Sequence, residues 1–194
     1  MVATQLSDRF VSALVYAAHL HANQVRKDGK VPYIAHLLSV SALVLEDGGT
    51  EDEAIAGLLH DGVEDRGGDR TRQEIQRQFG DNVAAIVDGC TEPYLATNVS
   101  WNARKLGYIE QIRSASASVR RVSLADKLHN ARSLLASLQQ EGDRVWSRFN
   151  GGKAQMLWFY QALCEVYCST TQDYLSQEFA RVMAEIEAIA LINP

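Results

Sequence analysis

Proline and cysteine are both scarce in this sequence, and each scarcity narrows the possible folds. Only 3 prolines occur among 194 residues, at positions 32, 93 and 194, so long stretches contain no residue that interrupts a helix. The 3 cysteines, Cys90, Cys164 and Cys168, form no Cys-x-x-Cys pair. Such a sparse, odd set is not the framework of a disulfide-rich fold and is typical of buried thiols in a reducing compartment.

An excess of positive charge and long apolar runs are lacking as well. The formal net charge is -5, which disfavours general nucleic-acid binding. No apolar run is long enough to span a bilayer, and the N-terminus lacks the pattern of a signal peptide. We therefore expect a cytoplasmic protein without a nucleic-acid or membrane partner. A small anionic ligand held by a few local cations remains compatible with this charge.

Helical periodicity runs through most of the sequence instead. Apolar residues recur at helical spacing, and no alternating strand pattern stands out. Thr50 with Glu53 and Thr71 with Glu74 fit capping boxes, and Asp81 fits a further cap. We predict an all-α fold in one domain, with irregular segments at 25–33, around a turn at Asp28-Gly29, and at 93–99. The expected helices cover about 5–24, 34–47, 51–66, 72–79, 82–91, 100–114, 119–138, 152–168 and 172–191.

The segment LLHDGVED, residues 58–65, ends an apolar helix with an imidazole and three carboxylates. His60 and Glu64 lie four residues apart, as do Asp61 and Asp65, so each pair shares one side of a helix. Carboxylates are disfavoured at the negative C-terminal end of a helix unless a cation compensates. The pattern alone fits either a solvated helix end or a pair of metal ligands, His60 and Asp61.

Two further polar residues in apolar surroundings fit the same demand for a cation. His36 lies in PYIAHLLSV, where it is either a satisfied core histidine or a ligand. Asp126 lies in SLADKLHN, close to Leu124 and Leu128, where a buried carboxylate needs a partner.

Three segments in order, HANQVRKDGKVPYIAH, LLHDGVED and SLADKLHNAR, resemble the motifs of the HD superfamily in its RelA/SpoT hydrolase branch. The sequence is similar to the small single-domain alarmone hydrolases over about residues 9–136. The resemblance implies an HD-domain helical bundle, with residues 1–194 forming one hydrolase domain. The C-terminal helices, at about 143–191, are then expected to pack on the motif core.

The resemblance also implies a metal centre and its catalytic acids. Its four ligands would be His36, His60, Asp61 and Asp126. Manganese is the ion of the family, and Zn²⁺ or Fe²⁺ would also suit imidazole and carboxylate ligands. Glu64 and Asp65 follow the ligand pair by one turn and would orient water or move protons, as the matching acids of the family do.

The reaction implied by the resemblance is hydrolysis of the 3′-pyrophosphate of ppGpp or pppGpp, which gives GDP or GTP and pyrophosphate. Arg26 and Lys27 match the nucleotide-binding pair of the family, while Asn130, Arg132 and Ser133 match its substrate contacts on the third motif. An adenosine alarmone such as ppApp, or another substrate of HD-type nucleotidases and phosphodiesterases, stays an alternative. A catalytically inactive nucleotide or metal sensor is a third alternative, which Glu64 and Asp65 disfavour.

Some residues depart from the family pattern or extend beyond it. Leu37 stands where proline is usual, Gly62 where a larger residue is common, and Arg66 where threonine is common. These departures leave the ligands intact and bear on substrate preference. Lys153 follows the turn Asn150–Gly152 and either begins an ordinary helix or meets an anion of the substrate.

Overall fold

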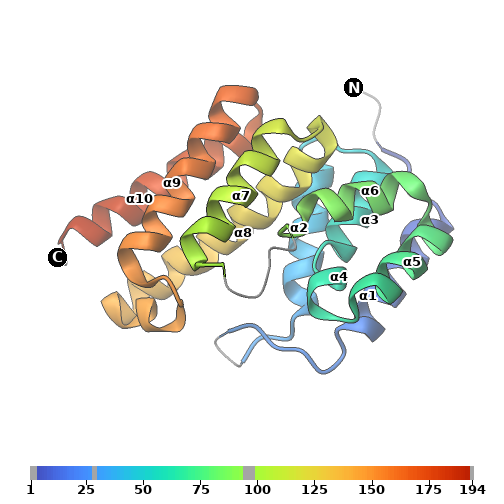
Figure 1. Cartoon of the computed structure of the whole chain (residues 1–194), viewed down its shortest axis with the longest axis horizontal. Helices are drawn as coiled ribbons and strands as arrows, with labels where there is room; N and C mark the ends of the chain where they lie inside the picture. The colour runs from blue at the N-terminus through green and yellow to red at the C-terminus, as the bar shows by residue number, and fades with distance from the viewer. Residues whose placement is uncertain (1–3, 28–29, 94–98, 193–194) are drawn as a thin grey trace. The chain divides into compact units, whose positions relative to one another are not determined.

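The computed structural model describes residues 4–27, 30–93 and 99–192, and these residues are almost entirely helical (Figure 1). One isolated β-bridge, between Val25 and Pro32, lies in the loop before the second helix. The predicted Asp28-Gly29 turn and most of the irregular segment at 93–99 lie outside the described residues. The all-α prediction is confirmed. The elements are α1 (Asp8–Leu20), α2 (Ile34–Glu46), α3 (Glu51–Leu59), α4 (Gly62–Asp65), α5 (Gly68–Phe79), α6 (Asp81–Cys90), α7 (Trp101–Ser114), α8 (Ala117–Glu141), the 3₁₀ helix η1 (Gly142–Arg148), α9 (Gly152–Thr170) and α10 (Tyr174–Ile192).

The chain divides into two compact units. The first comprises Met1–Glu92 and Ala115–Asp126, and the second comprises Pro93–Ser114 and Lys127–Pro194. Helix α8 thus contributes its first turns to one unit and the rest to the other. The interpretation of residues 1–194 as a single hydrolase domain stays a prediction.

Helix α3 is the centre of the first unit, where it packs against α1, α2 and α6. All its residues from Glu53 to Leu59 are buried. Gly57 allows α2 to come close, because a Cβ at this position would lie 3.2 Å from Cα of Ser41. The Ser41 hydroxyl donates a hydrogen bond to the Ala54 carbonyl, at 2.9 Å, across the same contact. The small residue therefore sets the spacing between the two helices that carry His36 and His60.

The start of α3 is fixed as the sequence predicts, but its end is not. Thr50 and Glu53 form the predicted capping box. The expected continuous helix instead ends at Leu59, and Gly62–Asp65 forms the separate helix α4. The break follows from His60, whose imidazole donates to the Gly57 carbonyl at 2.9 Å and so satisfies a carbonyl at the end of α3.

The predicted caps of α5 and α6 are wrong. Helix α5 begins at Gly68 after Gly67, and the Thr71 hydroxyl donates to the Arg66 carbonyl, at 2.6 Å, rather than capping a helix. Helix α6 begins at Asp81 with Gly80 as its N-cap, and no side chain caps it. Gly67, Gly68 and Gly80 all have positive φ, which an L side chain rarely adopts.

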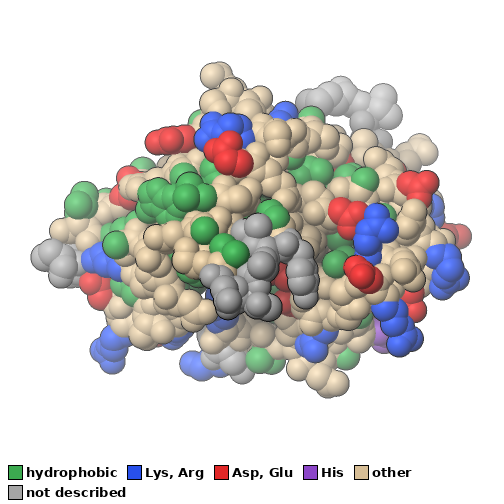
Figure 2. Space-filling model, viewed as in Figure 1, with side chains coloured by type: hydrophobic (Ala, Val, Ile, Leu, Met, Phe, Trp, Pro, Cys, Tyr) green, Lys and Arg blue, Asp and Glu red, His purple; other side chains and the backbone are tan. Residues whose placement is uncertain are grey.

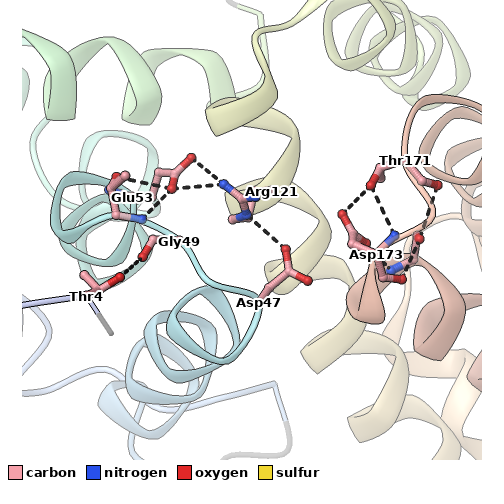
Figure 3. A network of polar contacts seen from close by, with 9 residues as sticks. Thr4, Asp47, Gly49, Glu53, Arg121, Thr171 and Asp173 are labelled. Atoms are coloured by element: carbon pink, nitrogen blue, oxygen red, sulfur yellow. Dashed lines mark hydrogen bonds and ion pairs between the residues drawn. The ribbon is translucent and has the colours of Figure 1, made fainter. Parts of the chain in front are cut away.

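A buried ion network attaches the first turns of α8 to α2 and α3 (Figure 3). The Arg121 guanidinium donates to Asp47 at the end of α2, at 2.9 Å, and to Glu53 on α3, also at 2.9 Å. Both carboxylate side chains are only 3% exposed. Glu53 therefore serves the capping box and the ion network at once, and the network fixes the part of α8 that ends in Asp126.

The second unit has an aromatic core built on α7 and α9. The Phe159 ring lies edge-on to Trp101 and Tyr160 and at a tilt to Tyr108. Asp173 caps the start of α10 by accepting a hydrogen bond from the backbone N–H of Ser176, at 2.9 Å (Figure 3).

The visible surface carries both signs of charge. On the face that Figure 2 shows, acidic and basic side chains are interspersed over α5 and α6. Arg72 of α5 and Asp88 of α6 form an ion pair, with 2.7 Å between Nη2 of Arg72 and Oδ2 of Asp88. Within the described part of the chain, no helix combines the length and the hydropathy needed to cross a membrane.

Candidate metal centre

Three buried side chains from separate helices of the first unit form a cluster that can hold a metal ion. They are His36 on α2, His60 at the end of α3 and Asp126 on α8, and they offer ligand atoms within 4.8 Å of one another. Nε2 of His36 lies 3.2 Å from Oδ1 of Asp126, and Nε2 of His60 lies 3.7 Å from the same oxygen.

Asp61 lies beside this cluster. Its Oδ2 is 3.1 Å from Nε2 of His60 and 3.6 Å from Nε2 of His36. Nε2 of each imidazole thus lies within 3.7 Å of an oxygen of Asp61 and of an oxygen of Asp126, and the role of Asp61 as a fourth ligand stays a prediction. Two ligands that each lie about 2.1 Å from an ion are about 3.0 Å apart at a right angle and about 3.4 Å apart at a tetrahedral angle. The four measured separations run from 3.1 to 3.7 Å, which is comparable with these values.

His60 is oriented to present a lone pair to the cluster. Its Nδ1 donates to the Gly57 carbonyl, so the neutral ring carries its proton there and leaves Nε2 as an acceptor. Nε2 is buried and makes no hydrogen bond within the described structure. A backbone hydrogen bond on one nitrogen and a metal on the other is the usual arrangement of a metal-binding histidine. The donor set therefore fits a divalent ion.

The electrostatics of the cluster also demand positive charge. Burial lowers the pKa of His60, but the carboxylates of Asp61 and Asp126 outweigh burial and raise it well above its ordinary value. Burial raises the pKa of Asp61, yet His60 and a hydrogen bond with His36 hold it well below its ordinary value. Either a proton on an imidazole or a bound metal cation can supply the positive charge that compensates the carboxylates of Asp61 and Asp126.

Tyr33 holds Asp61 from the side. Its hydroxyl donates to Oδ2 of Asp61 at 2.6 Å. Burial comes first and the Asp61 charge second in raising the pKa of Tyr33 far above its usual range, so the hydroxyl keeps its proton. The Tyr33 ring stacks on His21 at 5.3 Å between centroids and meets His36 edge-on at 5.6 Å. The hydrogen bond from Tyr33 to Asp61 joins residues 28 apart in the sequence, and no local sequence pattern predicts it.

The two predicted catalytic acids lie on α4, which directly follows Asp61 in the chain. Because α4 is separate from α3, Glu64 and Asp65 do not stand at the C-terminus of a long helix as expected. The side chain of Asp65 accepts a hydrogen bond from the Gln24 amide at 2.6 Å. An oxygen of Glu64 lies 3.5 Å from the backbone nitrogen of Glu92.

The predicted substrate-binding residues belong to both units. In the first unit, the Arg26 guanidinium lies 5.8 Å from the centre of the Tyr33 ring, and Lys27 is exposed in the same loop. The structure thus connects Arg26 to the metal cluster through Tyr33, which contacts both. The guanidinium remains within reach of an aromatic face.

The other four predicted contacts lie in the second unit. Arg132 pairs with Glu178 at 2.9 Å, and the Ser133 hydroxyl donates to the His129 carbonyl within α8. Lys153 is the second residue of α9 and pairs with Asp143 at 3.1 Å. With Asn130, which also lies on α8, they stay predictions.

The all-helical fold and the mixed cluster of histidines and carboxylates identify this chain as a helical protein with a candidate metal site. The chain belongs to the HD-domain family, whose sequence model matches residues 13–155.

The chain is similar to proteins whose names describe hydrolysis of guanosine 3′,5′-bis(diphosphate). It is similar to guanosine-3′,5′-bis(diphosphate) 3′-pyrophosphohydrolase MESH1 of Drosophila melanogaster, with 35% identity over 69% of this chain and 73% of that protein. It is 37% identical to a probable guanosine-3′,5′-bis(diphosphate) 3′-pyrophosphohydrolase of Synechocystis sp., over 69% of this chain but only 18% of that longer protein. A solved structure of a metazoan ortholog of SpoT that hydrolyses ppGpp matches with a TM-score of 0.75 and 26% identity, over 95% of this chain and 98% of that chain.

Proposed function

We propose that this protein is a metal-dependent 3′-pyrophosphohydrolase of guanosine 3′,5′-bis(diphosphate), with pppGpp as a further substrate. The observation that carries the proposal is the cluster of His36, His60 and Asp126, with Asp61 beside it. The similarity to proteins named as ppGpp hydrolases supports the choice of substrate. The products are GDP or GTP and pyrophosphate.

The proposed ligands are His36, His60, Asp61 and Asp126, and the proposed ion is Mn²⁺. Two nitrogens and two oxygens suit Mn²⁺, and they also suit Zn²⁺ and Fe²⁺. When bound, such an ion lowers the pKa of water and neutralises phosphate charge. Tyr33 holds Asp61 in place through its hydroxyl.

The remaining steps belong to side chains around the cluster. Glu64 and Asp65 take the proton of the attacking water and return one to the leaving oxygen. Arg26 and Lys27 attract the anionic nucleotide, with the Arg26 guanidinium against its base. Intact acids beside the ligands favour an enzyme over a catalytically inactive sensor.

Four further residues predicted to contact the substrate lie in the second unit. Asn130 contacts the nucleoside, Arg132 and Ser133 also reach the substrate, and Lys153 meets one of its anions. The ion pairs of Arg132 with Glu178 and of Lys153 with Asp143 must then be exchanged for contacts with the substrate when it binds. Replacing Lys153 with Ala should raise KM, and an unchanged KM would remove Lys153 from the site.

Product analysis tests the proposal. The purified protein is incubated with Mn²⁺ and, in separate reactions, with the 3′-pyrophosphates of guanosine and adenosine nucleotides. Release of pyrophosphate and GDP is expected. Faster hydrolysis of the adenosine compound would show that the substrate base is adenine rather than guanine. Release of orthophosphate would indicate another HD-type nucleotidase. Absence of any turnover by the Mn²⁺-loaded protein would overturn the proposed function.

A further inference from the structure

Gln24 connects three side chains next to the metal cluster. It follows α1, and all its partners lie in the first unit. Its Oε1 lies 2.7 Å from Nδ1 of His21 and 2.8 Å from Nε of Arg66. Its Nε2 lies 2.6 Å from Oδ2 of Asp65. One amide thus joins the proposed catalytic acid to the end of α1 and to the residue that follows α4.

The chemistry of these partners fixes the orientation of the amide. Arg66 can only donate, and an ionised Asp65 can only accept. The Gln24 oxygen must therefore face Arg66 and the Gln24 nitrogen must face Asp65. A flipped amide would bring two donors together at Arg66 and two acceptors together at Asp65. The oxygen also requires a proton on Nδ1 of His21, so three contacts agree on one arrangement.

The position of Gln24 is itself rigid. His21 is buried, with 2% of its surface exposed, and its ring stacks on Tyr33. Burial comes first in lowering the pKa of His21, which keeps the ring neutral with its proton on Nδ1. Tyr33 in turn donates to Asp61. The Gln24 side chain is therefore linked through His21 to Tyr33, which holds a proposed metal ligand.

Asp65, in contrast, has little to hold its side chain. It is exposed and belongs to a helix of four residues. Its backbone N–H bonds to the Asp61 carbonyl at 2.9 Å, which fixes the main chain but not the carboxylate. Within the described part of the chain, the Gln24 amide is the hydrogen-bond partner of that carboxylate. The bond engages one lone pair of Oδ2, and the remaining lone pairs of the carboxylate can accept a proton.

We propose that Gln24 is a positioning residue, which fixes the Asp65 carboxylate for proton transfer and is itself locked by Arg66. This inference rests on the proposed hydrolase function and on the role of Asp65 in it. Gln24 was not among the residues singled out from the sequence, and Arg66 was noted only as a departure from the family pattern.

Two substitutions separate positioning from packing. Gln24→Ala removes the amide, and we expect kcat to fall about tenfold or more, because a misplaced catalytic group is costly. Gln24→Glu keeps the shape and the acceptor for Arg66 and His21, but it places a second carboxylate against Asp65. If Gln24 positions Asp65, kcat should fall in Gln24→Glu at least as much as in Gln24→Ala. If Gln24 only fills space, kcat of Gln24→Glu should be nearly normal. Bound Mn²⁺ and KM should stay near their original values in both variants.

The matched control is Gln78→Glu, which makes the same chemical change at an exposed position of α5. It should leave kcat unchanged. Arg66→Ala should lower kcat less than Gln24→Ala, because the amide remains but its orientation is no longer locked. A normal kcat in both Gln24 variants would overturn the proposal.

A double variant decides whether Gln24 acts through Asp65. If it does, Gln24→Ala combined with Asp65→Asn should have the kcat of Asp65→Asn alone. Additive losses would overturn the proposal, because Gln24 would then act elsewhere. A normal rate in Asp65→Asn would overturn it too, yet leave the metal-dependent hydrolysis standing. Absence of turnover by the unmodified protein would instead remove the proposed function, and the inference with it.

Discussion

At the scale of single residues, removing the Tyr33 hydroxyl tests whether Asp61 is held for a metal ion. Tyr33→Phe keeps the ring on His21 but loses the 2.6 Å hydrogen bond to Asp61. We expect Mn²⁺ affinity to fall about tenfold or more, as for other residues that orient metal ligands. Isothermal titration with Mn²⁺ measures the change.

The control is Tyr16→Phe, which removes a hydroxyl that donates to Glu74, at 3.0 Å, elsewhere in the first unit. It should leave Mn²⁺ affinity as it is. Equal affinities in Tyr33→Phe and Tyr16→Phe would mean that Asp61 needs no support from Tyr33.

Asp126 and Glu64 have different proposed roles, and one substitution of each separates them. Asp126→Ala removes a buried oxygen of the cluster, so metal and activity should be lost together. Glu64→Gln keeps the cluster intact, so bound Mn²⁺ should persist while kcat falls by about 10²-fold or more. Metal analysis beside single-turnover kinetics gives both quantities. The same loss of metal in the two variants would contradict the assigned roles.

Sequence reasoning found the residues of the cluster but not those that hold them. His36, His60 and Asp126 are out of place in apolar helices, and this is visible without coordinates. The bond between Tyr33 and Asp61 joins residues 28 apart, and that between Gln24 and Asp65 joins residues 41 apart. Tyrosine and glutamine are ordinary in a loop, so only the folded chain reveals these contacts.

At the scale of helices, Arg121 is the test of how α8 is fixed to α2 and α3. Arg121→Met would leave the carboxylates of Asp47 and Glu53 buried without their cation. Breaking a buried ion pair on one side costs about 3–5 kcal/mol, so the free energy of unfolding should fall by about this amount. Urea denaturation measures it.

Arg113→Met serves as the control for Arg121→Met. Arg113 pairs with Glu110 on the surface of α7, where both side chains are more than half exposed. Such a pair contributes about 1 kcal/mol or less. If both variants lost the same small amount of stability, the network in Figure 3 would not hold α8 in place.

Acidification should act through the same network. Burial raises the pKa of Glu53, but hydrogen bonds from Thr50 and Ser118 and the charge of Arg121 together hold it below its ordinary value of 4.5. Ionised Glu53 therefore stabilises the fold above about pH 4.5, and this contribution is lost as pH falls through the lower folded pKa. The stability difference between the original protein and Arg121→Met should narrow from pH 6 to pH 3. A constant difference across this range would contradict the assignment.

The helices themselves were predictable because their periodicity and their glycines are local signals. The capping box of Thr50 and Glu53 formed as predicted, since both partners lie within one turn. The break after Leu59 was not predictable, because helical spacing continues through His60, and the bond from its imidazole to the Gly57 carbonyl is visible only in the folded chain. The capping box predicted from Thr71 and Glu74 does not form. The Thr71 hydroxyl donates to the Arg66 carbonyl, and the Glu74 carboxylate accepts a hydrogen bond from the Tyr16 hydroxyl.

At the scale of the whole molecule, the two compact units should respond differently to metal. All four proposed ligands lie in the first unit, and Asp126 is its last residue. An ion that binds the folded state stabilises it by about 2.7 kcal/mol at a concentration of 100 Kd. The helices that carry the ligands should be stabilised more by the ion than the other helices.

Hydrogen exchange with and without Mn²⁺ measures this difference helix by helix. We expect Mn²⁺ to slow exchange in α2, in α3 and in residues 117–126, because each carries a ligand or adjoins one. Exchange in α9 and α10 should change much less, and Asp126→Ala should abolish the effect everywhere. Metal binding requires Nε2 of His60 without a proton, and the carboxylates of Asp61 and Asp126 raise the pKa of His60 well above its ordinary value, so the protection should weaken as the pH falls through that raised pKa. Equal protection of α3 and α10 would mean that both units open together, so that the metal stabilises the chain as one cooperative body.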